Sequence, residues 1–228
     1  MLALGYTVIP TFAVIAGTVL ASVKRPSDSF ISAMQHLAAG VVFAAAATEI
    51  LPQVMHQADP VATFVGGALG VALMLGLKSV EARFRGPAAL LGAIGVDILV
   101  DGLVLGLAFV AGAKAGILLT LALTLEVLFL GVVLTTELSE TIVSRARVIL
   151  VIAGLALLLP LGTLAALPVA TLSPAVIAGF LSFGLMALLY LVTEELLVEA
   201  HAKPDSPLIS AMFFAGFLGL LLIEEALG

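Results

Sequence analysis

Three acidic residues stand in the middle of long apolar segments, where a carboxylate is costly. Asp97 and Asp101 lie near the centre of the segment 88–111, and Glu126 lies midway along the segment 115–136. A charged side chain at the centre of a bilayer costs about 2.5–3.5 kcal/mol. Because no Lys or Arg is expected at the same depth, a bound cation is the expected partner of these acids.

The spacing of the acids favours one shared metal site. Asp97 and Asp101 are four residues apart, which places both on one face of a helix. Two carboxylates side by side repel each other unless a cation lies between them. Glu126, on the next antiparallel helix, is at comparable depth and is predicted to complete the site. The alternative is that the acids are protonated and hydrogen-bond to neighbouring helices.

Further ionisable residues lie near the ends of the apolar segments. Glu49 and Glu224 are expected near the outer face of a membrane, and Glu194, Glu195 and His201 near the inner face. We predict them to be entry and exit stations for a cation; the alternative is that they are solvated residues at span ends.

The composition is that of a membrane protein. Of the 228 residues, 62% are hydrophobic and 11% are charged, whereas soluble domains carry about 25% charged residues. Nine Lys and Arg against fifteen Asp and Glu argue against a nucleic-acid partner, and the lack of Cys excludes a disulfide scaffold. The sequence therefore predicts an all-α polytopic protein whose surroundings are the lipid bilayer.

Eight segments are long enough to cross a bilayer, for which about 20 mostly apolar residues are needed. Their runs are continuous rather than alternating, which excludes a transmembrane barrel. The weakest boundary, 112–116, has two Gly flanking Lys114 and favours a turn. No connecting segment is long enough for a soluble domain, so residues 1–228 are predicted to form one transmembrane domain. The expected spans are 5–23, 30–52, 61–80, 88–111, 115–136, 148–169, 173–198 and 207–227.

The basic residues predict the orientation. Of the nine Lys and Arg, only Lys114 lies after an even-numbered span, and the other eight lie around the ends of odd-numbered spans. The positive-inside rule therefore assigns those ends to the cytoplasm and places both termini outside. The first span has no basic segment before it, which favours a span over a cleaved signal. Small size and simple loops suggest a multi-pass protein of a prokaryotic inner membrane. The cytoplasmic basic residues are Lys24, Arg25, Lys78, Arg83, Arg85, Arg145, Arg147 and Lys203.

The sequence contains a weak internal repeat. Thr48-Glu49-Ile50-Leu51 in the second span matches Thr193-Glu194-Glu195-Leu196 in the seventh, and His56 and His201 follow at the same offset. The two spans run in opposite directions, and such self-similarity is typical of inverted-repeat transporters. We therefore predict that spans one to three repeat as spans six to eight, around spans four and five.

These motifs resemble those of the ZIP family of divalent-metal transporters over nearly the whole chain. Ala38-Ala39-Gly40 and the later Glu49-Ile50-Leu51-Pro52 are similar to its second-span pattern. The run from Asp97 to Gly106 falls on the fourth-span motif HNxPEGxxxG, and Glu126 falls on the second position of the fifth-span motif. Residues 194–201 resemble the seventh-span ending.

The departures from the family fall on the metal site. Asp97 stands where the family has His, Ile98 where it has Asn, Asp101 where it has Glu, and Phe129 where the fifth-span motif has its Glu. One carboxylate set, Asp97, Asp101 and Glu126, remains. The resemblance implies zinc, whereas an all-carboxylate site suits manganese or iron better.

The resemblance implies a secondary transporter that carries a divalent cation toward the cytoplasm, with the metal as cargo rather than cofactor. It also implies a homodimer and an elevator motion in which spans one, four, five and six move against the others. A second hypothesis keeps the fold but changes the cargo to a proton, a monovalent cation or a small organic cation. A third is an intramembrane enzyme using Asp97 and Asp101, which we disfavour because catalytic aspartates usually come from two facing elements.

Overall fold

The computed structural model describes residues 2–57, 59–83, 87–142, 144–203 and 206–227, with the backbone alone for 81–82, 87–90 and 140–141. The described residues form helices and no strand. Eight of these helices are long and apolar enough to cross a membrane, which confirms the predicted all-α, eight-span protein. The spans are α1 (Leu2–Val23); α2 (Asp28–Ala45), η1 (Ala46–Ile50) and α3 (Leu51–Gln57); α4 (Pro60–Arg83); α5 (Pro87–Ala111); α6 (Ala113–Thr141); α7 (Arg145–Ala156), α8 (Leu158–Ala166) and η2 (Leu167–Thr171); α9 (Pro174–Tyr190), η3 (Leu191–Leu196) and α10 (Leu197–His201); and α11 (Pro207–Leu227).

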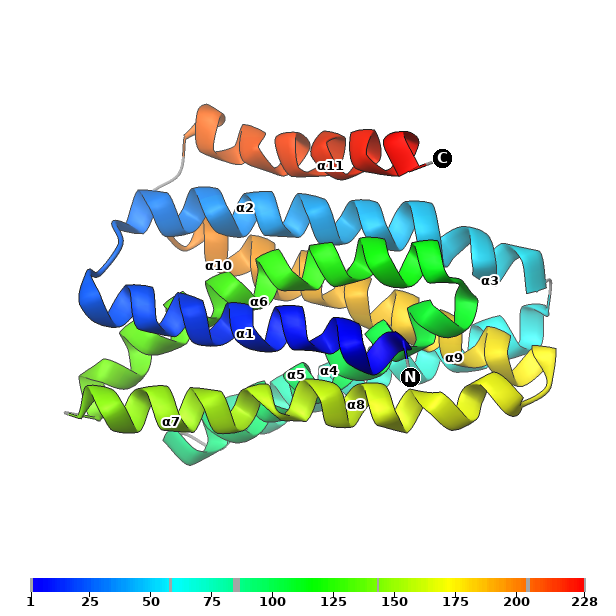
Figure 1. Ribbon diagram of the computed structural model, residues 1–228, viewed down its shortest axis with the longest axis horizontal. Helices are drawn as coiled ribbons and strands as arrows, with labels where there is room; N and C mark the ends of the chain where they lie inside the picture. Colours follow the sequence, from blue (N-terminus) through cyan, green and yellow to red (C-terminus); the bar gives the residue numbers. More distant parts are fainter. Residues whose placement is uncertain (1, 58, 84–86, 143, 204–205, 228) are drawn as a thin grey trace.

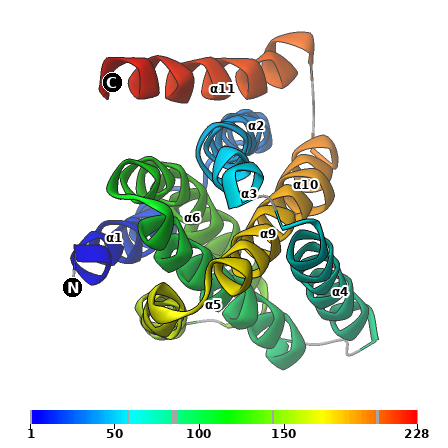
Figure 2. The same cartoon turned by 90° about the vertical axis from the view of Figure 1, so that its right-hand side faces the viewer.

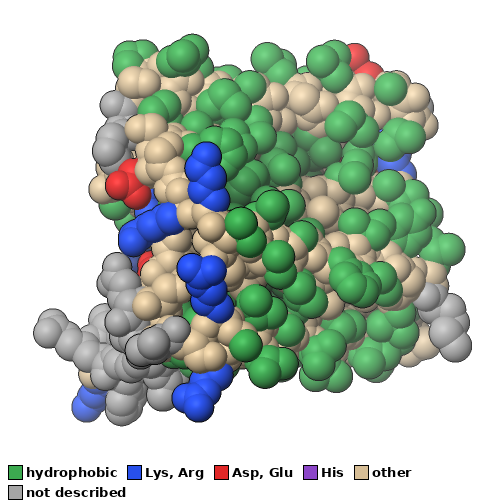
Figure 3. Space-filling model, turned by 60° about the vertical axis from the view of Figure 1, so that its left-hand side comes forward, with side chains coloured by type: hydrophobic (Ala, Val, Ile, Leu, Met, Phe, Trp, Pro, Cys, Tyr) green, Lys and Arg blue, Asp and Glu red, His purple; other side chains and the backbone are tan. Residues whose placement is uncertain are grey.

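The spans lie side by side and alternate in direction, so that every second junction falls at the same end (Figure 1). The junctions α1–α2, α4–α5, α6–α7 and α10–α11 gather at one end, which we call the basic end. Every described Lys and Arg except Lys114 lies at or toward it, and Figure 3 shows Lys and Arg side chains in a band beside a mostly hydrophobic flank. Arg85 lies outside the described residues.

Four spans form the inside of the bundle and four form its rim. The second, fourth, fifth and seventh spans are mostly buried, whereas no more than a third of the first, third, sixth or eighth span is buried. Each rim span packs mainly on one inner span: α1 on α6, α8 on α5, α4 on α9 and α11 on α2 (Figure 2). The rim exposes large apolar side chains such as Phe64 and Leu208, as expected of helices that face lipid.

Glycines allow the backbones of α5 and α8 to touch. A Cβ atom at Gly102 would collide with the backbone carbonyl of Leu159, and one at Gly162 with that of Leu99. Thr163 Oγ1 donates a hydrogen bond to the Gly102 carbonyl across the interface, at 2.8 Å. Small residues and interhelical hydrogen bonds of this kind hold helices together where no hydrophobic driving force acts between them.

The crossing of α1 and α6 has the same construction. A Cβ atom at Gly17 would collide with the carbonyl of Leu128, and one at Gly131 with that of Val14. Thr18, the residue after the rim glycine, places Oγ1 3.4 Å from the Gly131 carbonyl. In both crossings, therefore, a Gly-Thr pair of a rim helix lies against a glycine of an inner helix.

Three spans are irregular along their length. The second and seventh spans each contain one π-helical segment, η1 and η3, and each segment holds the Thr-Glu pair of the internal repeat. Pro52 accompanies the first of these segments and cannot donate a hydrogen bond to the Thr48 carbonyl. The sixth span breaks at Leu157, where Pro160 likewise cannot donate to the carbonyl of Ala156.

The fourth and fifth spans form one tight hairpin. A single residue, Gly112, separates α5 from α6, which confirms the predicted turn. The ring of Phe109 lies directly on Gly116, where a Cβ atom would collide with it. The hairpin therefore sets the mid-span acids of α5 opposite the acid of α6.

Candidate metal centre

The three mid-span acids converge, as their depth and spacing predict. Asp97 and Asp101 of α5 and Glu126 of α6 each offer a carboxylate oxygen, and these atoms all lie within 4.8 Å of one another. Asp101 and Glu126 are each only 2% exposed, whereas Asp97 is partly exposed. We call these three residues the acidic triad.

Two oxygens of the acidic triad are buried without a partner. Within the described part of the chain, Oδ2 of Asp101 and Oε2 of Glu126 have no hydrogen-bond donor. A buried polar group left unsatisfied costs about 1–3 kcal/mol, and more if it is charged. A cation between the two helices would satisfy both atoms, and an all-oxygen ligand set suits hard divalent ions. The triad therefore fits a metal ion chemically.

Two neighbouring cavities, of about 40 and 150 Å³, lie between the triad and the basic end. Both are lined by Asp97, Glu195 and Glu199, and the larger one also by Glu137 and Lys78. Each exceeds the roughly 10–15 Å³ that one water molecule needs. We call them together the acidic cavity, and they offer a hydrated ion room next to the triad. Of the predicted inner stations, Glu195 is thus placed beside the site.

Glu137 is a cavity residue that the sequence reasoning missed. It follows Glu126 by about three helical turns, and therefore lies on the same face of α6. That periodicity is the signal that would have found it. Gln35, also missed as a cavity residue, lines the smaller cavity and donates from Nε2 to Oε2 of Glu199 at 2.7 Å.

His201 lies beside another histidine and not in the acidic cavity. Its ring centroid is 4.8 Å from that of His36, in an edge-on arrangement. His36 is buried and its Nδ1 lies 2.9 Å from the Ser32 carbonyl, to which it donates because a carbonyl can only accept. His201 itself is exposed, and neither ring lines the acidic cavity.

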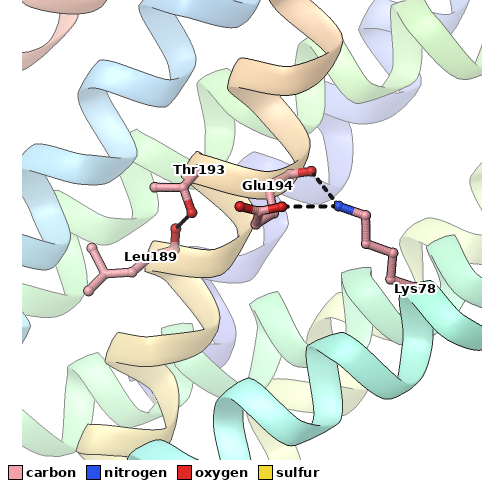
Figure 4. Close-up of polar contacts among 4 residues, drawn as sticks. All are labelled: Lys78, Leu189, Thr193 and Glu194. Atoms are coloured by element: carbon pink, nitrogen blue, oxygen red, sulfur yellow. Dashed lines mark hydrogen bonds and ion pairs between the residues drawn. The ribbon is translucent and has the colours of Figure 1, made fainter.

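Glu194, the other predicted inner station, is engaged with a lysine (Figure 4). Lys78 Nζ lies 3.3 Å from Glu194 Oε2 and 3.1 Å from its backbone carbonyl. The ammonium also lies 5.7 Å from the ring centroid of Tyr190. The hydroxyl of the preceding residue, Thr193, turns back to the Leu189 carbonyl at 2.9 Å. Glu194 thus holds Lys78 at the rim of the cavity.

We expect this ion pair to contribute little to stability, because its side chains are 45% and 52% exposed. Exposed pairs typically contribute about 0.2–1 kcal/mol. A double-mutant cycle with Lys78→Gln and Glu194→Gln, measured by unfolding in detergent, should give a coupling energy below about 1 kcal/mol. A coupling of several kcal/mol would show that the pair is a structural anchor.

The two predicted outer stations lie together at the opposite end of the bundle. Glu49, in η1, is 7% exposed and is near enough to Glu224 of α11 and to Lys114 to feel both charges. Lys114 Nζ lies 3.8 Å from Oε1 of Glu224. Oε2 of Glu224 is buried without a described hydrogen-bond partner. The structure thus brings Glu49 and Glu224 into one cluster with Lys114, at the end of the bundle opposite the basic end.

No family model matches this sequence, and no curated protein matches it significantly. The function must therefore be argued from the acidic triad and its surroundings.

Proposed function

We propose that this protein is a ZIP-like secondary transporter that moves a divalent cation across the membrane toward the cytoplasm. The observation that carries the proposal is the acidic triad, whose three carboxylates meet within 4.8 Å. Two of its buried oxygens lack a hydrogen-bond partner among the described residues. Among the cavities described, those that reach the triad lie on the side of the basic end. A bound cation would give these two oxygens a partner and offset the negative charge of the triad.

The basic end is the cytoplasmic end in this proposal, because Lys and Arg are retained on the cytoplasmic side of membrane proteins. Both termini then lie outside. The acidic cavity opens to the cytoplasm, and the cluster of Glu49, Glu224 and Lys114 lies toward the outer face. The conformation corresponds to an inward-facing state, in which an ion at the triad is released to the cytoplasm.

The packing supports an inverted repeat. An inverted repeat pairs span one with span six, two with seven, three with eight and four with five. Under this pairing, the contact between spans one and five (α1–α6) corresponds to the contact between spans six and four (α8–α5). The same pairing relates the α11–α2 crossing to the α4–α9 crossing, and these four pairs are the main rim contacts. The two Gly-Thr pairs, Gly17-Thr18 and Gly162-Thr163, then occupy matching positions, as do the π-helical segments η1 and η3.

The same contacts support two bodies that move against each other. The glycine-lined crossings of α1 with α6 and of α8 with α5 join spans one, four, five and six. The contacts of α11 with α2 and of α4 with α9 join the remaining four spans. The acidic cavity lies between these groups, since α5 and α6 line one side and α2, α4, η3 and α10 the other. The triad would travel with the first body in an elevator motion, in each subunit of a homodimer.

The donor set favours a hard or borderline ion. Carboxylates suit Mn²⁺ and Fe²⁺, whereas imidazole and thiolate favour zinc, and the described triad has carboxylates alone. The ZIP resemblance favours zinc. Zinc, manganese and iron are therefore the cargo candidates.

Uptake into proteoliposomes tests the proposal. We expect saturable uptake of at least one ion from a panel of Zn²⁺, Mn²⁺, Fe²⁺, Cd²⁺ and Mg²⁺. A folded Asp97→Asn/Asp101→Asn variant should show only background uptake, because it removes two of three anionic ligands without changing side-chain size.

The matched control is Asp28→Asn/Glu225→Gln, which removes two exposed acids outside the triad and should transport like the wild type. Equal flux in the wild type and the triad variant would refute the metal site. Uptake of a proton or monovalent cation, but of no divalent ion, would establish the changed-cargo hypothesis instead.

A further inference from the structure

Lys78 is the one basic residue among the described residues that line the acidic cavity. It lies in the last part of α4 and lines the larger of the two cavities, which is also lined by Asp97 of the acidic triad. A lysine weakens the attraction of such a cavity for a cation, so its presence requires an explanation. The other ionisable residues of the lining are Asp97, Glu126, Glu137, Glu195 and Glu199.

Contacts with the seventh span hold the ammonium group of Lys78 at the rim of the cavity (Figure 4). Nζ lies 3.3 Å from Oε2 of Glu194, 3.1 Å from the carbonyl of the same residue and 5.7 Å from the ring centroid of Tyr190. The side chains of Lys78 and Glu194 are 45% and 52% exposed, and such pairs are weak because they stay in contact with water. Glu194 therefore places the positive charge beside the cavity without burying it.

These contacts keep Lys78 in the group of spans that does not carry the triad. Helix α4 packs mainly on α9, which ends at Tyr190, and Glu194 lies in η3 of the same span. The triad belongs to α5 and α6, in the other group. In the elevator motion proposed above, the distance from Lys78 to an ion at the triad therefore changes with the conformation. In the inward-facing state Lys78 and Asp97 line one cavity.

A positive charge in this place acts on the ion in one conformation more than in the other. An ammonium group repels a divalent cation more strongly than a monovalent one, because the Coulomb energy grows with the product of the charges. The repulsion lowers the affinity of the triad while both groups border one cavity, and it weakens as the triad moves away. Since an ion favours the state that binds it better, a lower affinity in the inward-facing state favours release.

We propose that Lys78 promotes release of the transported ion, by repelling a divalent cation held at the acidic triad in the inward-facing state. This inference rests on the proposed transport of a divalent cation. Lys78 acts as a charge beside the site and not as a metal ligand, because an ammonium group has no lone pair to offer. The alternative is that Lys78 only anchors Glu194, in which case breaking their ion pair from either side has the same effect.

Titration of the full-length protein in neutral detergent with Mn²⁺ and with Zn²⁺ measures the proposed effect. Lys78→Gln should bind the ion at least about threefold more tightly than the wild type, because it removes the repulsion. Lys78→Arg keeps the charge and should bind like the wild type. Glu194→Gln breaks the same ion pair but keeps the lysine, so it should not bind more tightly. In proteoliposomes, Lys78→Gln should lower both the KM and the maximal rate of uptake, because a more tightly held ion leaves more slowly.

The matched control is Lys24→Gln, which removes the same charge from the basic end but changes no residue of the cavity wall. It should bind like the wild type. Equal tightening in this control would reduce the effect to the net charge of the protein, and equal tightening in Glu194→Gln would assign it to the ion pair; either result overturns the proposal.

The same titration distinguishes failure of this proposal from failure of the metal site. If the wild type binds the ion, Asp101→Asn does not, and Lys78→Gln binds no more tightly than the wild type, only the role of Lys78 is refuted. If the wild type binds neither ion, or Asp101→Asn binds as well as the wild type, the metal site is refuted and the role of Lys78 with it.

Discussion

Replacing Asp101 by Asn or Glu126 by Gln is expected to abolish the rise in melting temperature that a bound divalent cation gives the wild type. A ligand present at 100 times its dissociation constant stabilises a protein by about 2.7 kcal/mol. In a chain of this size such a gain corresponds to a shift of roughly 5–10 °C. Both residues are 2% exposed, so an amide in either place offers the ion a neutral oxygen where a charged ligand stood.

The same variants should not melt below the ion-free wild type. In the absence of an ion, each buried carboxylate has an oxygen without a described partner, and the charged form is costly in this setting. Because the amide is uncharged and nearly the same size, the substitution removes that cost. A gain or no change without the ion, together with a lost response to the ion, separates a binding defect from misfolding.

Glu225→Gln is the control for this experiment, because Glu225 is exposed and lies outside the acidic triad, at the end of the bundle opposite the basic end. It should respond to the ion like the wild type. If the Asp101 and Glu126 variants kept the full response, the ion would bind elsewhere and the acidic triad would lose its proposed role.

Gly162→Ala is expected to lower the free energy of unfolding by about 1–3 kcal/mol or more, the range for overpacked interiors. A Cβ atom at this position would collide with the Leu99 carbonyl and lie against the backbone of Gly102 and Leu103. These atoms belong to a helix backbone and cannot move aside as a flexible side chain would. Since Asp101 lies within that stretch of α5, we also expect weaker binding of a divalent cation. Unfolding in detergent and ion titration measure the two effects.

Gly154→Ala, in the same span, is the matched control. A Cβ atom at Gly154 would meet no other atom within 4 Å. Alanine is the better helix former by about 0.8–1.0 kcal/mol in helix interiors, so this variant should be as stable as the wild type or more so. Equal destabilisation of the two variants would indicate that the contact between α5 and α8 is not close.

The spans and the acidic triad could be predicted because local rules determine them. The bilayer demands about 20 apolar residues per helix, and that requirement, together with the charged and turn residues between the apolar runs, separates the eight segments. A spacing of four residues places Asp97 and Asp101 on one face, and the Gly112 turn brings Glu126 to the same depth. The break at Leu157 follows equally from a local cause, Pro160 three residues later.

The partners of the terminal ionisable residues could not be predicted, because they come from distant parts of the chain. Glu194 meets Lys78, and Glu224 meets Lys114 and Glu49, only after the rim spans have packed. Nothing in the local sequence indicates which rim span lies against which inner span. That choice depends on the fit of glycines to facing backbones, which is a property of two surfaces together.

The one-residue connection between α5 and α6 has a consequence for biosynthesis. All three carboxylates lie on this single hairpin, so their meeting requires no contact with any other span. Contacts between neighbouring segments form early and with little loss of chain entropy. The acids can therefore face one another, and share a proton or an ion, from the moment the hairpin enters the bilayer. The other spans then assemble around carboxyl groups that already face one another on the hairpin.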